Sequence, residues 1–117
     1  FANAGCPMVS LITGKAIGEG YAAMANKGLG ADIVYAFPTA EISAVEKETG
    51  AMILFDNKSK ADEFAAQFST AEAAAKQGVV DDIIEPAETR AKLIGALDMA
   101  SNKREQKLPK KHGVMPL

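Results

Sequence analysis

Short apolar runs alternate with alanine-rich, amphipathic segments along the chain. Residues 8–12, 31–37 and 78–84 are apolar and rich in β-branched side chains, which predicts three strands. The second run stops before Pro38, which cannot donate to a strand ladder. Residues 40–44 alternate enough to predict a further short strand. We expect the first three strands to lie in one sheet, with the alanine-rich helices outside it.

Helical patterns fill the segments between these runs. Residues 21–26 and 47–55 predict helices, and residues 58–76 predict two helices divided at Ser69-Thr70, where Thr70 offers an N-cap. A last helix begins near Pro86 and runs to about residue 102. Residues 14–20 hold three glycines and predict an irregular turn. Phe64 and Phe68 lie four positions apart in the segment 58–76, so both should face the core.

The alternation of strands and helices predicts an α/β domain over residues 1–102, followed by a basic tail at residues 103–117. A length of 117 residues with 48% apolar content suits one modest core. Because the chain opens at Phe1, inside what reads as the end of a helix, we expect a fragment of a longer protein.

Composition excludes several classes of function. The net charge of −2, with both signs interspersed, predicts no nucleic-acid partner. No stretch has the roughly 20 apolar residues of a membrane helix, so direct membrane insertion is not expected. The lone Cys6 cannot form an internal disulfide, which favours the cytoplasm, and we expect it to be a small buried apolar residue.

The best local candidate for chemistry is the turn formed by Gly18, Glu19 and Gly20 ahead of a helix. Glycines there can leave backbone N–H groups pointing into open space, where they stabilise a developing negative charge. A Gly-x-Gly turn serves tight backbone packing about twice as often. The dinucleotide-binding fingerprint is not met, because Ala23 stands where its third glycine belongs.

Side-chain catalysts are scarce in this sequence. His112 is the only histidine and lies in the tail, so we expect it to be solvated. No spacing of Cys and His predicts a metal site. Asp81 and Asp82 are adjacent on a predicted strand and point to opposite faces, which favours capping and ion pairs over a carboxylate pair for acid–base chemistry.

Four ordered blocks resemble the carboxyltransferase subunits of biotin-dependent acyl-CoA carboxylases and decarboxylases. Residues 12–21, ITGKAIGEGY, resemble the family's ITxKAYGGAY, and residues 32–42, DIVYAFPTAEI, resemble its AWPTAEI stretch. Residues 78–90, GVVDDIIEPAETR, resemble GxVDDIIxPxxTR, and residues 111–117, KHGVMPL, resemble the C-terminal KHGNIPL. The resemblance therefore covers essentially the whole chain.

The resemblance implies a crotonase-like fold, of which this chain would be part of the second, biotin-side half. It implies carboxyl transfer between carboxybiotin and a short acyl-CoA: carbon dioxide is released, the biotin anion takes the α-proton of the thioester, and the enolate attacks the carbon dioxide. Two backbone oxyanion holes would steady the anions. Gly18, Glu19 and Gly20 match the family's glycine turn, so the amides of Glu19 and Gly20 would serve biotin.

The same resemblance implies partners: a biotin carboxyl carrier protein, an N-terminal carboxyltransferase half, and further copies in a homo-oligomer. Glu19 stands where the family has Gly, so we expect strain there if that position requires a positive φ. A carboxylate near an oxyanion would also oppose it. Two alternatives follow: an inactive or truncated assembly subunit of such a complex, or another crotonase-fold acyl-CoA enzyme.

Overall fold

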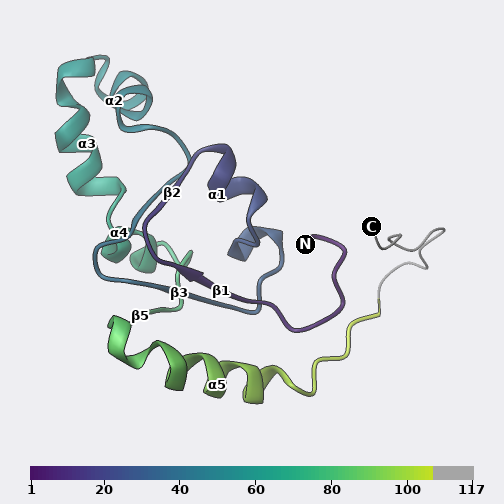
Figure 1. Cartoon of the computed structure of the whole chain (residues 1–117). Helices are drawn as coiled ribbons and strands as arrows, with labels where there is room; N and C mark the ends of the chain where they lie inside the picture. The colour runs from purple at the N-terminus through teal and green to yellow at the C-terminus, as the bar shows by residue number, and fades with distance from the viewer. Residues whose placement is uncertain (107–117) are drawn as a thin grey trace, which may run out of the picture.

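Three parallel strands form the central sheet of the computed structural model, which describes residues 1–106 (Figure 1). They are β1 (Val9–Ile12), β3 (Ile33–Ala36) and β5 (Asp82–Ile83), in the order β1-β3-β5. Ser10 pairs with Val34, and Tyr35 pairs with Asp82. The prediction of one sheet is confirmed, although β5 is much shorter than the apolar run that predicted it.

A second, two-stranded parallel sheet was not predicted. It pairs β2 (Lys15–Ile17) with β4 (Glu41–Ser43). The expectation of an irregular turn over residues 14–20 is therefore wrong for its middle part. The glycines on both sides of β2 indicated a turn and not a strand. The strand forms because β4 supplies its hydrogen bonds.

The helices largely match the expected segments. Residues 47–55 form α2 as predicted. Thr70 accepts a hydrogen bond from the Ala73 N–H at 3.1 Å, which confirms the N-cap between α3 (Ala61–Phe68) and α4 (Ala71–Lys76). The α1 helix begins two residues earlier than expected. The helices are α1 (Glu19–Ala23), η1 (Lys27–Leu29), α2 (Lys47–Phe55), η2 (Lys58–Lys60), α3 (Ala61–Phe68), α4 (Ala71–Lys76), η3 (Pro86–Glu88) and α5 (Thr89–Ala100).

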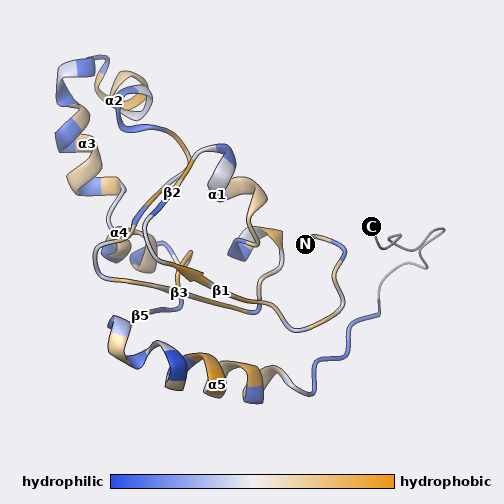
Figure 2. Ribbon diagram, in the orientation of Figure 1, coloured by the Kyte–Doolittle hydropathy of each residue, from blue (hydrophilic) through white to orange (hydrophobic). Residues whose placement is uncertain are grey.

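The central sheet separates two apolar clusters, because neighbouring residues of a strand face opposite sides. Val34 and Ala36 face a cluster that includes residues of α4. Tyr35 packs on the other side with Ile84 and with Ala96 of α5. Figure 1 shows α5 along one side of the sheet, with α1 and α4 on the other. Figure 2 shows apolar colour along β1 and in bands on α5.

The sequence also predicts the surroundings of Cys6, Phe64, Phe68 and His112. Cys6 is exposed, so its expected burial is wrong; it lies before β1, outside both sheets. Phe64 is buried as expected. Phe68 was also expected to face the core, but it lies at the last position of α3 and is 38% exposed, with its ring centroid 5.3 Å from that of Phe64. His112 and the C-terminal block at residues 111–117 lie outside the described residues.

Candidate functional site

The Gly18 turn joins β2 to α1. Gly18 is the N-cap of α1 with φ 61° and ψ −130°, a backbone conformation that favours glycine. Its N–H donates to the Ser43 carbonyl at 3.0 Å, and its carbonyl accepts from the Ala22 N–H at 3.0 Å. The turn is therefore anchored to β4 on one side and starts the helix on the other.

The amides of Glu19 and Gly20 are the first two of α1. Because the first N–H groups of a helix have no carbonyl to bond within it, they are open to an outside acceptor. No other group of residues 1–106 accepts from them. Glu19 does not have a positive φ, since Gly18 takes that role. The condition under which backbone strain was expected at Glu19 is therefore not met.

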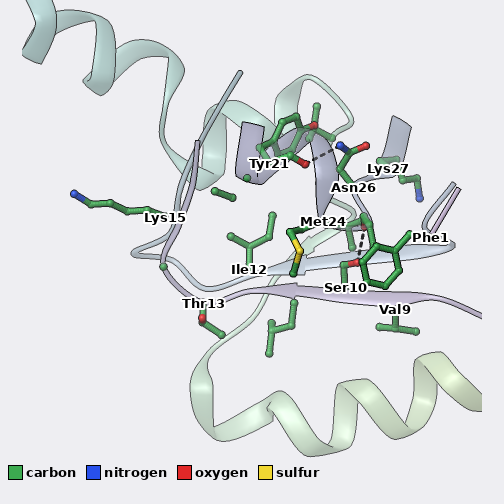
Figure 3. Close-up of a pocket in the computed structure, with 17 residues that line it drawn as sticks. Phe1, Val9, Ser10, Ile12, Thr13, Lys15, Tyr21, Met24, Asn26 and Lys27 are labelled. Atoms are coloured by element: carbon green, nitrogen blue, oxygen red, sulfur yellow. Dashed lines mark hydrogen bonds between the residues drawn. The ribbon is translucent and has the colours of Figure 1, made fainter. Parts of the chain in front are cut away.

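A hollow of about 540 Å³ lies between α1 and the sheet, and Gly20 is on its wall. Figure 3 shows side chains from β1 and from the α1 region around it, with Phe1 and Met24 near Ser10. Ile12, Val34 and Val79 also line it. Its volume is within the range of small-molecule sites, which are mostly apolar with a few polar groups.

The charged groups on this wall are cationic. Lys15 and Lys27 line the hollow, and its lining among the described residues holds no carboxylate, imidazole or thiol. Lys27 donates to Asp81 at 2.7 Å, so this cation is already paired. Partial burial raises the pKa of the Tyr21 hydroxyl, which therefore remains protonated at neutral pH. The wall can stabilise an anion but offers no carboxylate or imidazole as a base.

The adjacent carboxylates of Asp81 and Asp82 form separate ion pairs, as expected for neighbouring side chains that point to opposite faces. Asp81 pairs with Lys27 and also accepts the Val34 N–H at 2.8 Å, while Asp82 pairs with Lys92 of α5 at 2.9 Å. The ion-pair roles are confirmed. Among residues 1–106 no cluster of His, Cys, Asp and Glu could hold a metal ion.

Sequence reasoning missed two residues near the C-terminal end of α1. The Asn26 carboxamide donates to the Tyr21 carbonyl at 2.8 Å, and the Ser10 hydroxyl donates to the Ala25 carbonyl at 2.6 Å (Figure 3). Asn26 also caps η1, and an Asn followed by Lys-Gly was a signal for that cap. Nothing in the sequence could indicate the contact of Ser10.

Comparison with known proteins shows which protein family the chain matches. The model of the carboxyl transferase domain matches residues 1–115. The chain is 43% identical to the methylmalonyl-CoA decarboxylase alpha subunit of Veillonella parvula, covering all of this chain and 24% of that subunit. It is 39% identical to the methylmalonyl-CoA carboxyltransferase 12S subunit of Propionibacterium freudenreichii subsp. shermanii, covering 99% and 24%.

A solved structure of transcarboxylase 12S superposes with a TM-score of 0.86 at 40% identity, covering 99% of this chain and 24% of that one. That protein was solved with methylmalonyl-coenzyme A and methylmalonic acid bound and forms a hexamer. The crotonase-like carboxyltransferase fold is thereby confirmed. The chain spans about a quarter of the length of these relatives.

No helix of residues 1–106 is long and apolar enough to cross a membrane.

Proposed function

Because the chain belongs to the carboxyl transferase family, we propose that it forms the biotin-side part of a biotin-dependent acyl-CoA carboxyltransferase. The reaction is transfer of a carboxyl group between carboxybiotin and a short acyl-CoA of the methylmalonyl, propionyl or acetyl class. One observation carries the proposal: the family match runs over residues 1–115, so it includes the Gly18 turn and the wall of the hollow.

The chain's own contribution is a backbone oxyanion hole. The amides of Glu19 and Gly20 are open at the start of α1, and Gly20 borders the hollow. Amides fixed in this way stabilise charge without reorganising during the reaction. Gly18 permits the turn that aims them. Bound carboxybiotin supplies the carboxyl group, and its ureido oxygen is the acceptor that these amides suit.

The lining of the hollow fits such a group. Its walls are mainly apolar, as a bicyclic ring requires, and its charged lining residues are Lys27, which is paired with Asp81, and Lys15, which lies 3.9 Å from Glu41. With no carboxylate or imidazole in the described lining, the part of the chain around the hollow stabilises an anion by amides and offers no such side chain to remove a proton there. This agrees with chemistry in which the substrate-derived anion is itself the base.

We place the rest of the active site on other segments. The outer edge of β1 has no strand beside it in residues 1–106, and Ile94, Leu97 and Met99 of α5 are exposed. Parallel sheets are normally covered on both faces and edges seldom remain open. We infer that an N-terminal carboxyltransferase half covers this edge, that further copies complete an oligomer in the cytoplasm, and that a biotin carrier protein delivers the carboxyl donor.

A hybrid subunit tests the activity. In the 12S subunit of Propionibacterium freudenreichii subsp. shermanii, this chain replaces the quarter that it matches, and transfer from methylmalonyl-CoA to free biotin is measured. Transfer above that of a hybrid with the Gly18–Gly20 turn deleted supports the proposal. A hybrid that assembles normally but transfers no carboxyl group from methylmalonyl-CoA or malonyl-CoA contradicts it.

One observation favours a second candidate, an inactive assembly subunit. The carboxylate of Glu19 is exposed next to the amides that would hold an oxyanion, and like charges repel. Glu19→Gly in the hybrid separates the candidates, because it removes the charge while leaving the amide. Under the proposed function the variant transfers at the same or a higher rate. A silent hybrid that becomes active only with Glu19→Gly identifies the assembly role.

A further inference from the structure

The direction of α1 is fixed by contacts at its ends. The helix has five residues, and its N-cap provides no side-chain hydrogen bond. Helices this short are not stable by themselves in water. The open amides of Glu19 and Gly20 therefore point where the flanking contacts hold the helix. One of these contacts is the Gly18 N–H to Ser43 bond already described; the others lie at the C-terminal end.

Asn26 provides the main contact at that end. Its Nδ2 donates to the carbonyls of Tyr21 at 2.8 Å and Ala22 at 3.1 Å. These carbonyls belong to the last turn of α1, where no helical N–H is available to them. Its Oδ1 accepts the Leu29 N–H at 2.8 Å. The carboxamide thus uses both of its ends, and it ties the last turn of α1 to η1.

The central sheet reinforces this contact. The Ser10 hydroxyl on β1 donates to the Ala25 carbonyl at 2.6 Å. Ala25 has φ 41°, a left-handed conformation that is unfavourable for a non-glycine residue. Such strain persists only where surrounding contacts enforce it. A chain of hydrogen bonds therefore runs from β1 through Ala25 and Asn26 to α1 (Figure 3).

We propose that Asn26 is a positioning residue for carboxyl transfer: its carboxamide holds α1 and with it the open amides of Glu19 and Gly20, of which Gly20 borders the hollow. This role rests on the function proposed above. Asn26 acts through the helix, since its Nδ2 bonds carbonyls on the opposite end of α1 from the amides. The reaction rate is sensitive to the position of such donors, because a displacement of about 1 Å can lower the rate about 100-fold.

A double-mutant cycle in the hybrid subunit tests the role. Asn26→Asp keeps the acceptor for Leu29 but loses both donors and puts a carboxylate against two carbonyls. We expect kcat to fall about 10- to 100-fold, with the KM for methylmalonyl-CoA nearly unchanged. Gly20→Pro removes the amide itself. If Asn26 acts through that amide, Asn26→Asp lowers kcat less than about threefold further in the Gly20→Pro background.

Two further variants control the experiment. Asn57 caps η2 through its Oδ1, away from the hollow, so Asn57→Asp should leave kcat unchanged. Asn26→Ser retains a capping oxygen for η1 and lacks the two amide donors, so it replaces Asn26→Asp if that variant does not assemble. It too should lower kcat, and less so in the Gly20→Pro background.

The outcomes distinguish the inference from its premise. If Gly20→Pro lowers kcat but neither Asn26 variant does, the positioning role is wrong and the oxyanion assignment stands. If the Asn26 variants lower kcat by the same factor in both backgrounds, Asn26 is merely structural and the role is again wrong. If Gly20→Pro leaves kcat unchanged, the oxyanion assignment fails, and the positioning role fails with it.

Discussion

The ring of Phe64 packs directly against Gly50, in the space that a side chain at position 50 would occupy. Gly50 is buried on α2, and Phe64 is 5% exposed on α3. A glycine normally weakens a helix interior. Here its missing side chain lets α2 and α3 approach closely enough to bury the ring.

Gly50→Ala should therefore destabilise the protein by about 1–3 kcal/mol, the usual cost of overpacking, although alanine is the better helix former. Gly95 in α5 is the matched control, because a Cβ there meets no atom within 4 Å. Gly95→Ala should be neutral or stabilise by about 0.5–1 kcal/mol. Urea unfolding of the chain measures both. Equal effects of the two substitutions would show that the contact with Phe64 is unimportant.

The predictable parts of the fold are those where local pattern and tertiary packing agree. Thr70 was identifiable as an N-cap because a hydroxyl ahead of an alanine-rich segment bonds locally. The strand at β3 was identifiable from β-branched residues and Pro38. By contrast, β2 has three residues between glycines and exists only through β4, which lies 24 residues or more further along the chain. Such a strand has no local signal.

The turn at Gly18 was predictable in position but not in geometry. The Gly18-Glu19-Gly20 pattern indicated a turn with open amides, whereas only the backbone shows that the positive φ falls on Gly18. The resemblance had suggested strain one residue later. The contact of Ser10 with Ala25 joins residues 15 positions apart, and neither residue type indicates it.

The ion pair of Asp32 and Lys103 should make stability depend on pH. Asp32 accepts the Met8 N–H at 2.8 Å and lies 2.9 Å from the Lys103 ammonium, and these two contacts hold its pKa below the usual value. A carboxyl group with a lowered folded-state pKa stabilises fully above its unfolded pKa of about 3.9 and loses that contribution as the pH falls through the folded value.

Asp32→Asn should therefore lower the free energy of unfolding by about 1–3 kcal/mol at pH 7, and the difference should shrink below about pH 4. The measurement is the urea midpoint of both proteins from pH 7 to pH 2.5. Asp98→Asn is the control, because Asp98 is exposed and its side chain has no ion pair among residues 1–106. A difference for Asp32→Asn that stays constant down to pH 2.5 would contradict the linkage.

Amide exchange should reveal whether another strand covers β1. The carbonyls of Met8 and Ile12 accept from the Asp32 and Phe37 amides at 2.9 and 3.0 Å, so they face β3. Peptide groups alternate along a strand, which turns the amides of Val9 and Leu11 to the open edge. In the hybrid subunit we expect hydrogen exchange at Val9 and Leu11 to be as slow as at Ser10 and Ile12. Fast exchange at Val9 and Leu11 together with slow exchange at Ser10 and Ile12 would mean that the outer edge of β1 remains open after assembly.

The final prediction concerns the amide of Gly20, which the proposed function assigns to the oxyanion. Proline is tolerated in the first turn of a helix, where its missing N–H costs no helical hydrogen bond, so Gly20→Pro removes the donor with little damage to α1. Loss of one such donor typically lowers kcat about 100- to 1000-fold. Gly20→Ala retains the N–H, and its Cβ meets no atom within 4 Å, so it should transfer carboxyl groups at a normal rate. Steady-state transfer from methylmalonyl-CoA to biotin by the two hybrid variants measures the difference. Equal rates would exclude this amide from the reaction, whereas a deficit confined to proline, with unchanged assembly, identifies the backbone N–H as the active group.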